Sequence, residues 1–190
     1  APERPVCLRR VDGHAVWVNS RALALAGIDA STPDPAGGII QRDARGEPTG
    51  VLVDNAMAAV MNAMPAATPA QIRDNLQRAM AHLVSLGVTA AHDAGVSDDQ
   101  LRAYEQLHRD RQLPLRIYAM LSTSDPANAT RIDAGPRRYD GGRLVARSVK
   151  VYADGALGSR GAALIEDYSD APGERGLLLQ SGDELRATMH

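Results

Sequence analysis

The spacing of hydrophobic positions along the chain changes near residue 65. Before this point, apolar residues come in short runs separated by stretches rich in Pro, Gly and Asp, a pattern typical of short strands joined by turns. The runs are residues 5–8, 14–18 and 50–53, and the turn-forming stretches are 31–38 and 43–48. A short helix is expected over 20–26, capped by Asn19 or Ser20. We therefore predict that residues 1–64 form a small β-containing domain.

After residue 65 the spacing becomes that of amphipathic helices that alternate with strands. Thr68 and Gln71 form a capping-box pattern with Pro69 at the first helical position, and apolar residues recur every three or four positions as far as Gly87. A second capping box begins at Ser97. Strands are expected over 88–93, 115–121 and 145–154, and a further helix from residue 181. Residues 65–190 thus form the second predicted domain.

This alternation predicts an α/β fold with a parallel sheet and right-handed crossovers. In such sheets functional groups lie at the carboxyl ends of the strands. The rule selects His92 and Asp93 at the end of the first strand, and Lys150 and Asp154 in the third. Because adjacent residues of a strand face opposite ways, only one of His92 and Asp93 can face the interior. We expect it to be Asp93.

Composition narrows the class of protein further. The 190 residues carry 21 Lys and Arg against 23 Asp and Glu, and 44% are hydrophobic, which is ordinary for a globular protein. This near-neutral balance, with few aromatic residues, argues against a nucleic-acid partner. The most apolar stretch, 56–67, is shorter than the roughly 20 residues that span a bilayer, so no membrane association is expected. The single cysteine, Cys7, leaves the compartment open between cytoplasmic and exported.

The stretch from Lys150 to Gly161 carries the most informative chemistry. In a strand, Lys150, Tyr152 and Asp154 share one face, so an amine and a carboxylate point the same way. A buried lysine can be a neutral amine that reacts with carbon dioxide to give a carbamate, an anionic ligand for metal. The alternative is a structural ion pair between Lys150 and Asp154, which the residues alone favour.

Other residues indicate substrate recognition. The glycines of the loop 155–161 lack the spacing of phosphate-binding loops, but they let the backbone approach a substrate, with Arg160 available for an anionic group. The alternative is an exposed surface loop. His14 and Trp17 beside a glycine turn could cover an apolar group, although a packed Trp and a hydrogen-bonded His give the same pattern. No two histidines have the H-x-H or H-x-x-x-H spacing of a zinc site.

Taken together, these segments resemble the third amidohydrolase family, the metal-dependent hydrolases related to N-substituted formamide deformylase. The resemblance covers nearly the whole chain in the order and spacing of that family. It is carried by 5–23 (PVCLRRVDGHAVWVNSRAL), 26–28, 33–35, 37–39, 46–52, 87–89 and 149–162 (VKVYADGALGSRGA).

The resemblance implies a (β/α)8 TIM barrel with an added β-domain. This chain would hold about strands 2 to 4 of the barrel with their helices, together with the β-containing insert. It also implies that Lys150 is the strand-4 lysine that binds metal once carboxylated. The resemblance therefore favours the metal ligand over the structural ion pair that the residues alone favour. Under the same resemblance His14, Trp17, Asp154 and Arg160 would contact the substrate, and the divalent metal expected is zinc.

The resemblance further implies that the catalytic site is incomplete in this chain. The family's strand-1 histidine pair would precede residue 1, and its strand-5 and strand-6 histidines and strand-8 aspartate would follow residue 190. A complete barrel needs at least about 200 residues. We therefore expect a fragment of an enzyme that hydrolyses C–N bonds of small amide-type molecules, itself inactive and without bound metal. The alternative is a catalytically silent binding module, or one that self-associates through exposed sheet edges.

Overall fold

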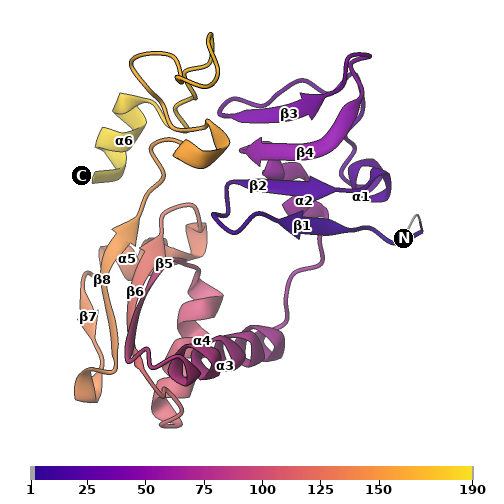
Figure 1. Cartoon of the computed structure of the whole chain (residues 1–190). Helices are drawn as coiled ribbons and strands as arrows, with labels where there is room; N and C mark the ends of the chain where they lie inside the picture. The colour runs from indigo at the N-terminus through magenta and orange to yellow at the C-terminus, as the bar shows by residue number, and fades with distance from the viewer. Residues whose placement is uncertain (1–2, 190) are drawn as a thin grey trace. The chain divides into compact units, whose positions relative to one another are not determined.

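A computed structural model describes residues 3–189, and its contacts group them into two compact units (Figure 1). The first unit combines the segment up to Pro65 with the segment from Tyr152 onward, and the second is Ala66–Val151. Helices and strands occur in both, which confirms the predicted mixed α/β class. The units differ from the predicted domains, 1–64 and 65–190, because the contacts of the segment from Tyr152 onward are with the N-terminal unit.

The first unit is built on a four-stranded antiparallel sheet of order β1-β2-β4-β3. Its core is apolar and contains Val16, Ile40 and Leu52 from the sheet, with Leu23 and Val60 from two helices. The elements are β1 (Cys7–Arg9), β2 (Ala15–Val18), α1 (Ser20–Leu25), β3 (Gly38–Arg42), β4 (Pro48–Asp54), α2 (Met57–Ala63), η3 (Leu157–Ser159) and α6 (Gly182–Met189).

The second unit contains a sheet of order β5-β6-β8-β7, in which β5, β6 and β8 are parallel and β7 is antiparallel to β8. Both predicted capping boxes are present, Thr68 with Gln71 and Ser97 with Gln100. The elements are α3 (Pro69–Ser85), β5 (Ala90–Val96), α4 (Asp98–Arg109), β6 (Arg116–Ser122), η1 (Pro126–Asn128), α5 (Ala129–Asp133), β7 (Arg137–Arg138), η2 (Asp140–Gly142) and β8 (Leu144–Lys150).

The two faces of the parallel sheet are different. Helices α3 and α4 lie against one face (Figure 1), where Met80 and Leu107 pack with Ile117, Ala119 and Leu121. Because side chains alternate along a strand, Tyr118, Met120 and Ser122 of β6 face the opposite way. The sheet therefore has one apolar face under helices and a second face that carries polar and aromatic groups.

The third predicted strand, 145–154, is too long. Strand β8 ends at Lys150, and the backbone after it pairs within the first unit instead. The Leu179 amide donates to the Ala153 carbonyl at 2.9 Å, and Asp154 forms an antiparallel bridge with Leu178. The prediction that Lys150 and Asp154 share one strand face is therefore wrong, because competing hydrogen-bond partners redirect the chain after Val151.

In the part of the chain that the structure describes, no helix combines the length and the apolar character needed to cross a membrane.

Candidate functional site

Lys150 occupies the carboxyl end of β8. Its carbonyl accepts hydrogen bonds from both the amide and the hydroxyl of Thr123, each at 3.2 Å, which fixes the end of the strand. Lys150 pairs in register with Ser122, and register neighbours in a parallel sheet point to the same side. The half-buried lysine therefore belongs to the face opposite α3 and α4, at the end where parallel sheets carry their functional groups.

The expectation that Asp93 faces the interior side is wrong. The Tyr104 hydroxyl, on α4, donates to the Asp93 carboxylate at 2.8 Å, so Asp93 lies on the helix-covered face. Burial, with the neighbouring Asp93 charge, raises the pKa of Tyr104. His92 faces the other way and stacks on Tyr118, with 4.9 Å between ring centroids. His92, Tyr118, Ser122 and Lys150 thus share the second face of the sheet.

In the first unit, His14 joins a cluster that the sequence did not indicate. Its imidazole Nδ1 lies 2.6 Å from Oδ1 of Asp54, and its ring meets Tyr152 edge to face at 5.9 Å between centroids. The Asp54 amide also donates to the His14 carbonyl at 3.0 Å, at the end of the β2–β4 pairing. Asp54 was missed, although it directly follows the apolar run 50–53, the same signal that singled out Asp93.

The Asp54 carboxylate packs against the glycine loop that follows β8. A Cβ atom on Gly155 would lie 2.5 Å from Asp54 Oδ2, and one on Gly161 would lie 2.6 Å from it, both too close for any side chain. The amide of Gly155 also donates to the Gly161 carbonyl at 3.2 Å, which closes the loop on itself. Glycine at both positions is therefore what allows the carboxylate to sit beside this loop.

The other three predicted substrate residues make different contacts. Trp17 is 61% exposed on β2 and lines a shallow cavity of about 310 Å³ with Leu8 and Val51. Asp154 Oδ2 accepts from the Ala163 amide at 3.0 Å, and Arg160 forms an exposed ion pair with Asp170 at 3.0 Å. Hydrogen bonding to Asp170 raises the pKa of Arg160. Of the four, the contacts join only His14 to the Asp54 cluster.

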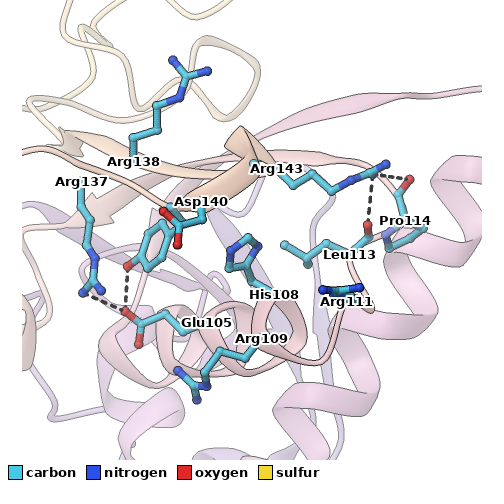
Figure 2. A pocket seen from close by; sticks show the side chains of 12 residues that line it. Glu105, His108, Arg109, Arg111, Leu113, Pro114, Arg137, Arg138, Asp140 and Arg143 are labelled. Atoms are coloured by element: carbon cyan, nitrogen blue, oxygen red, sulfur yellow. Dashed lines mark hydrogen bonds and ion pairs between the residues drawn. The ribbon is translucent and has the colours of Figure 1, made fainter.

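A larger cavity of about 1010 Å³ lies at the opposite end of the second unit's sheet (Figure 2). Its arginines are held by neighbours: Arg143 donates to the Leu113 carbonyl at 3.2 Å, and Arg137 lies 3.7 Å from Glu105. Burial raises the pKa of Tyr139, whose hydroxyl donates to Glu105, to about 12. In Figure 2 the guanidinium groups point in different directions, so this network fixes β7 and η2 to α4 and does not converge on a ligand.

The described residues do not form a metal site by themselves. No group of three or more His, Cys, Asp or Glu side chains within residues 3–189 is arranged to hold an ion. A centre of this kind needs three or four protein ligands. The described residues alone therefore do not supply a complete ligand set.

Comparisons with known proteins identify the family of the chain. The sequence matches the amidohydrolase family over residues 1–190. It is 33% identical to "Putative amidohydrolase YtcJ" of Bacillus subtilis (strain 168), over 97% of this chain and 35% of that protein. It is 28% identical to the N-substituted formamide deformylase of Arthrobacter pascens, over 88% of this chain and 32% of that enzyme.

A solved structure of an uncharacterized metal-dependent hydrolase from Pyrococcus horikoshii OT3 aligns with a TM-score of 0.69 and 27% identity. The alignment covers 98% of this chain and 37% of that one, so the chain spans little more than a third of its structural neighbour. The resemblance drawn from the sequence motifs is confirmed. The chain belongs to the amidohydrolase family.

Proposed function

We propose that this chain is part of a metal-dependent enzyme that hydrolyses carbon–nitrogen bonds of small amide-type substrates. The observation that carries the proposal is the family match over residues 1–190, together with a relative whose name specifies action on an N-substituted formamide. Since the chain spans 32% of that relative, the activity is proposed for a longer protein that contains this chain. The isolated chain is proposed to be inactive.

The proposed architecture is a (β/α)8 barrel of which β5, β6 and β8 are strands 2, 3 and 4. Three features support it: the strands are parallel, they lie side by side in chain order, and helices cover one face. In such a barrel the face opposite the helices is the interior. His92, Tyr118 and Lys150 would then line the barrel, with Lys150 at the end that carries the catalytic groups.

Lys150 is proposed to hold one divalent ion, zinc, as a carboxylated lysine. When bound, such an ion lowers the pKa of water and polarises the carbonyl of an amide. The chain's own contribution is to present Lys150 at a fixed strand end, where Thr123 binds its carbonyl. His14, Trp17, Asp154 and Arg160 are proposed to contact the substrate, with the imidazole and indole taking its uncharged part and Arg160 an anionic group.

The first test is the metal content of the purified 190-residue chain after tag removal and dialysis against a weak chelator. A value near zero per chain is expected, because these residues offer too few ligands. A value near one or above would show a complete site within this chain and contradict the proposed division of the ligands.

The second test is Lys150→Ala in a longer protein that contains the chain. Loss of residues that only support metal ligands costs 10–100-fold, so loss of a ligand should lower metal-dependent turnover by at least about 100-fold. Arg147→Ala, an exposed cation on the same strand, is the matched control and should retain activity. Near-normal turnover of the lysine variant would refute the role. In the isolated 190-residue chain Lys150 is the only lysine, so a carbamate signal from ¹³C-bicarbonate would there report on this side chain and the amino terminus alone.

A second proposal is self-association through sheet edges. In the described part of the second unit, β5 pairs only with β6, and β7 covers β8 only at Val145 and Ala146. Open strand edges pair readily with another copy. Sedimentation velocity over a hundredfold range of concentration tests this, and a monomer throughout would count against it.

A further inference from the structure

His14 and Asp54 are buried to different degrees. The Asp54 side chain is 1% exposed, whereas the His14 side chain is 18% exposed. The imidazole Nδ1 faces the carboxylate, and Nε2 has no hydrogen-bond partner among residues 3–189 and is not a buried atom. The ring therefore has one edge fixed against a buried anion and one edge that a ligand can reach.

The second oxygen of Asp54 has no hydrogen-bond partner in the described structure. Asp54 Oδ2 is fully buried and unpaired, and it lies against the backbone of Gly155 and Gly161. Leaving a buried carboxylate oxygen unpaired is costly, so such a group usually has a role beyond packing. Asp54 also adopts a left-handed backbone conformation, with φ of 49°, which is uncommon outside glycine. Both unfavourable features occur at the residue whose carboxylate lies against the imidazole.

We propose that Asp54 is a positioning residue that holds His14 with the proton on Nδ1 and presents Nε2 as a hydrogen-bond acceptor. A carboxylate beside one nitrogen of a neutral imidazole selects the tautomer in which that nitrogen carries the proton. Because Oδ2 rests on Gly155 and Gly161, the same carboxylate also fixes the loop that carries Arg160 relative to this acceptor.

The ligand that this arrangement fits is one with an N–H or O–H donor. Nε2 of the selected tautomer accepts a hydrogen bond and cannot donate one. The amide N–H of the proposed substrate is such a donor, and this part of the inference rests on the proposed function. The tautomer itself depends only on the contact between His14 and Asp54.

The tautomer is measured by long-range ¹H–¹⁵N correlation spectra of the ¹⁵N-labelled 190-residue chain, at a pH where the imidazoles are neutral. His14→Gln identifies the His14 signals among the five histidines. The wild-type chain should show Nδ1 protonated. Asp54→Ala removes the carboxylate that selects this tautomer. A fraction of the His14 rings in this variant should then carry the proton on Nε2.

The matched control is Asp12→Asn, because Asp12 accepts from the backbone amide of His14 at 3.1 Å and not from its ring. This variant should keep the wild-type tautomer. A wild-type His14 with its proton on Nε2 would overturn the proposal, even if Asp54→Ala failed to fold. A folded Asp54→Ala with the proton still entirely on Nδ1 would overturn it as well. Both readouts are independent of catalysis, so loss of the proposed function would leave this test intact.

Discussion

The two units of the chain arrange their chemistry in opposite ways. In the second unit, Lys150 lies at the carboxyl end of a parallel strand, where a general rule of α/β sheets places functional groups. His92 lies in the first half of β5, because that strand continues to Val96, beyond the predicted end at residue 93. In the first unit, His14 and Asp54 come from the ends of antiparallel strands, and the loop that packs on Asp54 lies a hundred residues further along the chain. The second unit is organised by local periodicity, and the first by contacts between distant segments.

This difference shows which residues a pattern can find. Lys150 follows a strand of the expected type, so its place in the sheet is predictable from nearby residues. Asp54 gains its surroundings only when Gly155 and Gly161 come to rest against it. The units also have separate apolar cores, so changes that disturb one should be distinguishable from changes that disturb the other.

The largest expected effects come from truncating a buried leucine in each core. Leu52 in the first unit and Leu107 in the second are both completely buried. Replacing either by Ala should lower the free energy of unfolding of its own unit by about 3–4 kcal/mol. Hydrogen exchange resolved by residue is the measurement, and protection should fall only in the unit that carries the change. Equal loss of protection in both units would show that they unfold together and would break the comparison.

Asp98→Asn should destabilise the second unit by about 3 kcal/mol at pH 7, because Arg131 and Arg102 would lose a buried partner. Burial raises the pKa of Asp98, but hydrogen bonds from Arg102 and Arg131 outweigh it and lower the pKa below its usual value. The stabilisation is therefore complete above about pH 4 and is lost as pH falls through the lowered pKa.

Urea unfolding of wild type and variant at several pH values tests this, and the difference between them should shrink in acid. Asp99→Asn, an exposed carboxylate in the same turn of α4, is the control and should change stability by no more than about 0.5 kcal/mol. A difference that does not depend on pH would mean that packing, and not charge, makes Asp98 important.

Gly161→Ala should lower the stability of the first unit by about 2 kcal/mol, because its methyl group would lie only 2.6 Å from Asp54 Oδ2 and clash with it. Gly158→Ala in the same loop is the comparison, since its methyl group would meet only the end of the flexible Arg10 side chain, which can move aside. Thermal unfolding followed by circular dichroism measures both. Equal effects of the two changes would contradict the packing of Asp54 on this loop.

The smallest expected effect is on a helix start. Thr68→Ala removes the side chain that accepts from the Gln71 amide and should cost the second unit about 1 kcal/mol. Ser97→Ala at the start of α4 should have a similar cost, because it removes the same kind of cap. Urea unfolding measures the loss of stability in both variants, and hydrogen exchange shows where protection is lost. A loss of protection in the first unit would contradict the expectation that each cap stabilises only its own helix in the second unit.

The sequence by itself determined the elements of the second unit and the family of the chain. Capping at Thr68 and Ser97 depends on residues three positions apart, so it can be predicted from the sequence without knowledge of the fold. The strand after each helix follows from short apolar runs, and Lys150 ends one of them. The motif series from residue 5 to residue 162 identified the amidohydrolase family, which the comparisons confirm.

Only the tertiary structure decided how the chemical groups are partnered. Asp93 faces α4 because Tyr104 offers it a hydrogen bond, and β8 ends at Lys150 because the following backbone pairs near Leu178. His14 meets Asp54 across 40 positions of sequence. Such contacts depend on which distant segments pair in a sheet or pack against a loop. Neither helical nor strand periodicity contains information about that pairing. A pattern can therefore propose a residue such as His14, but the fold assigns it Asp54 as its partner.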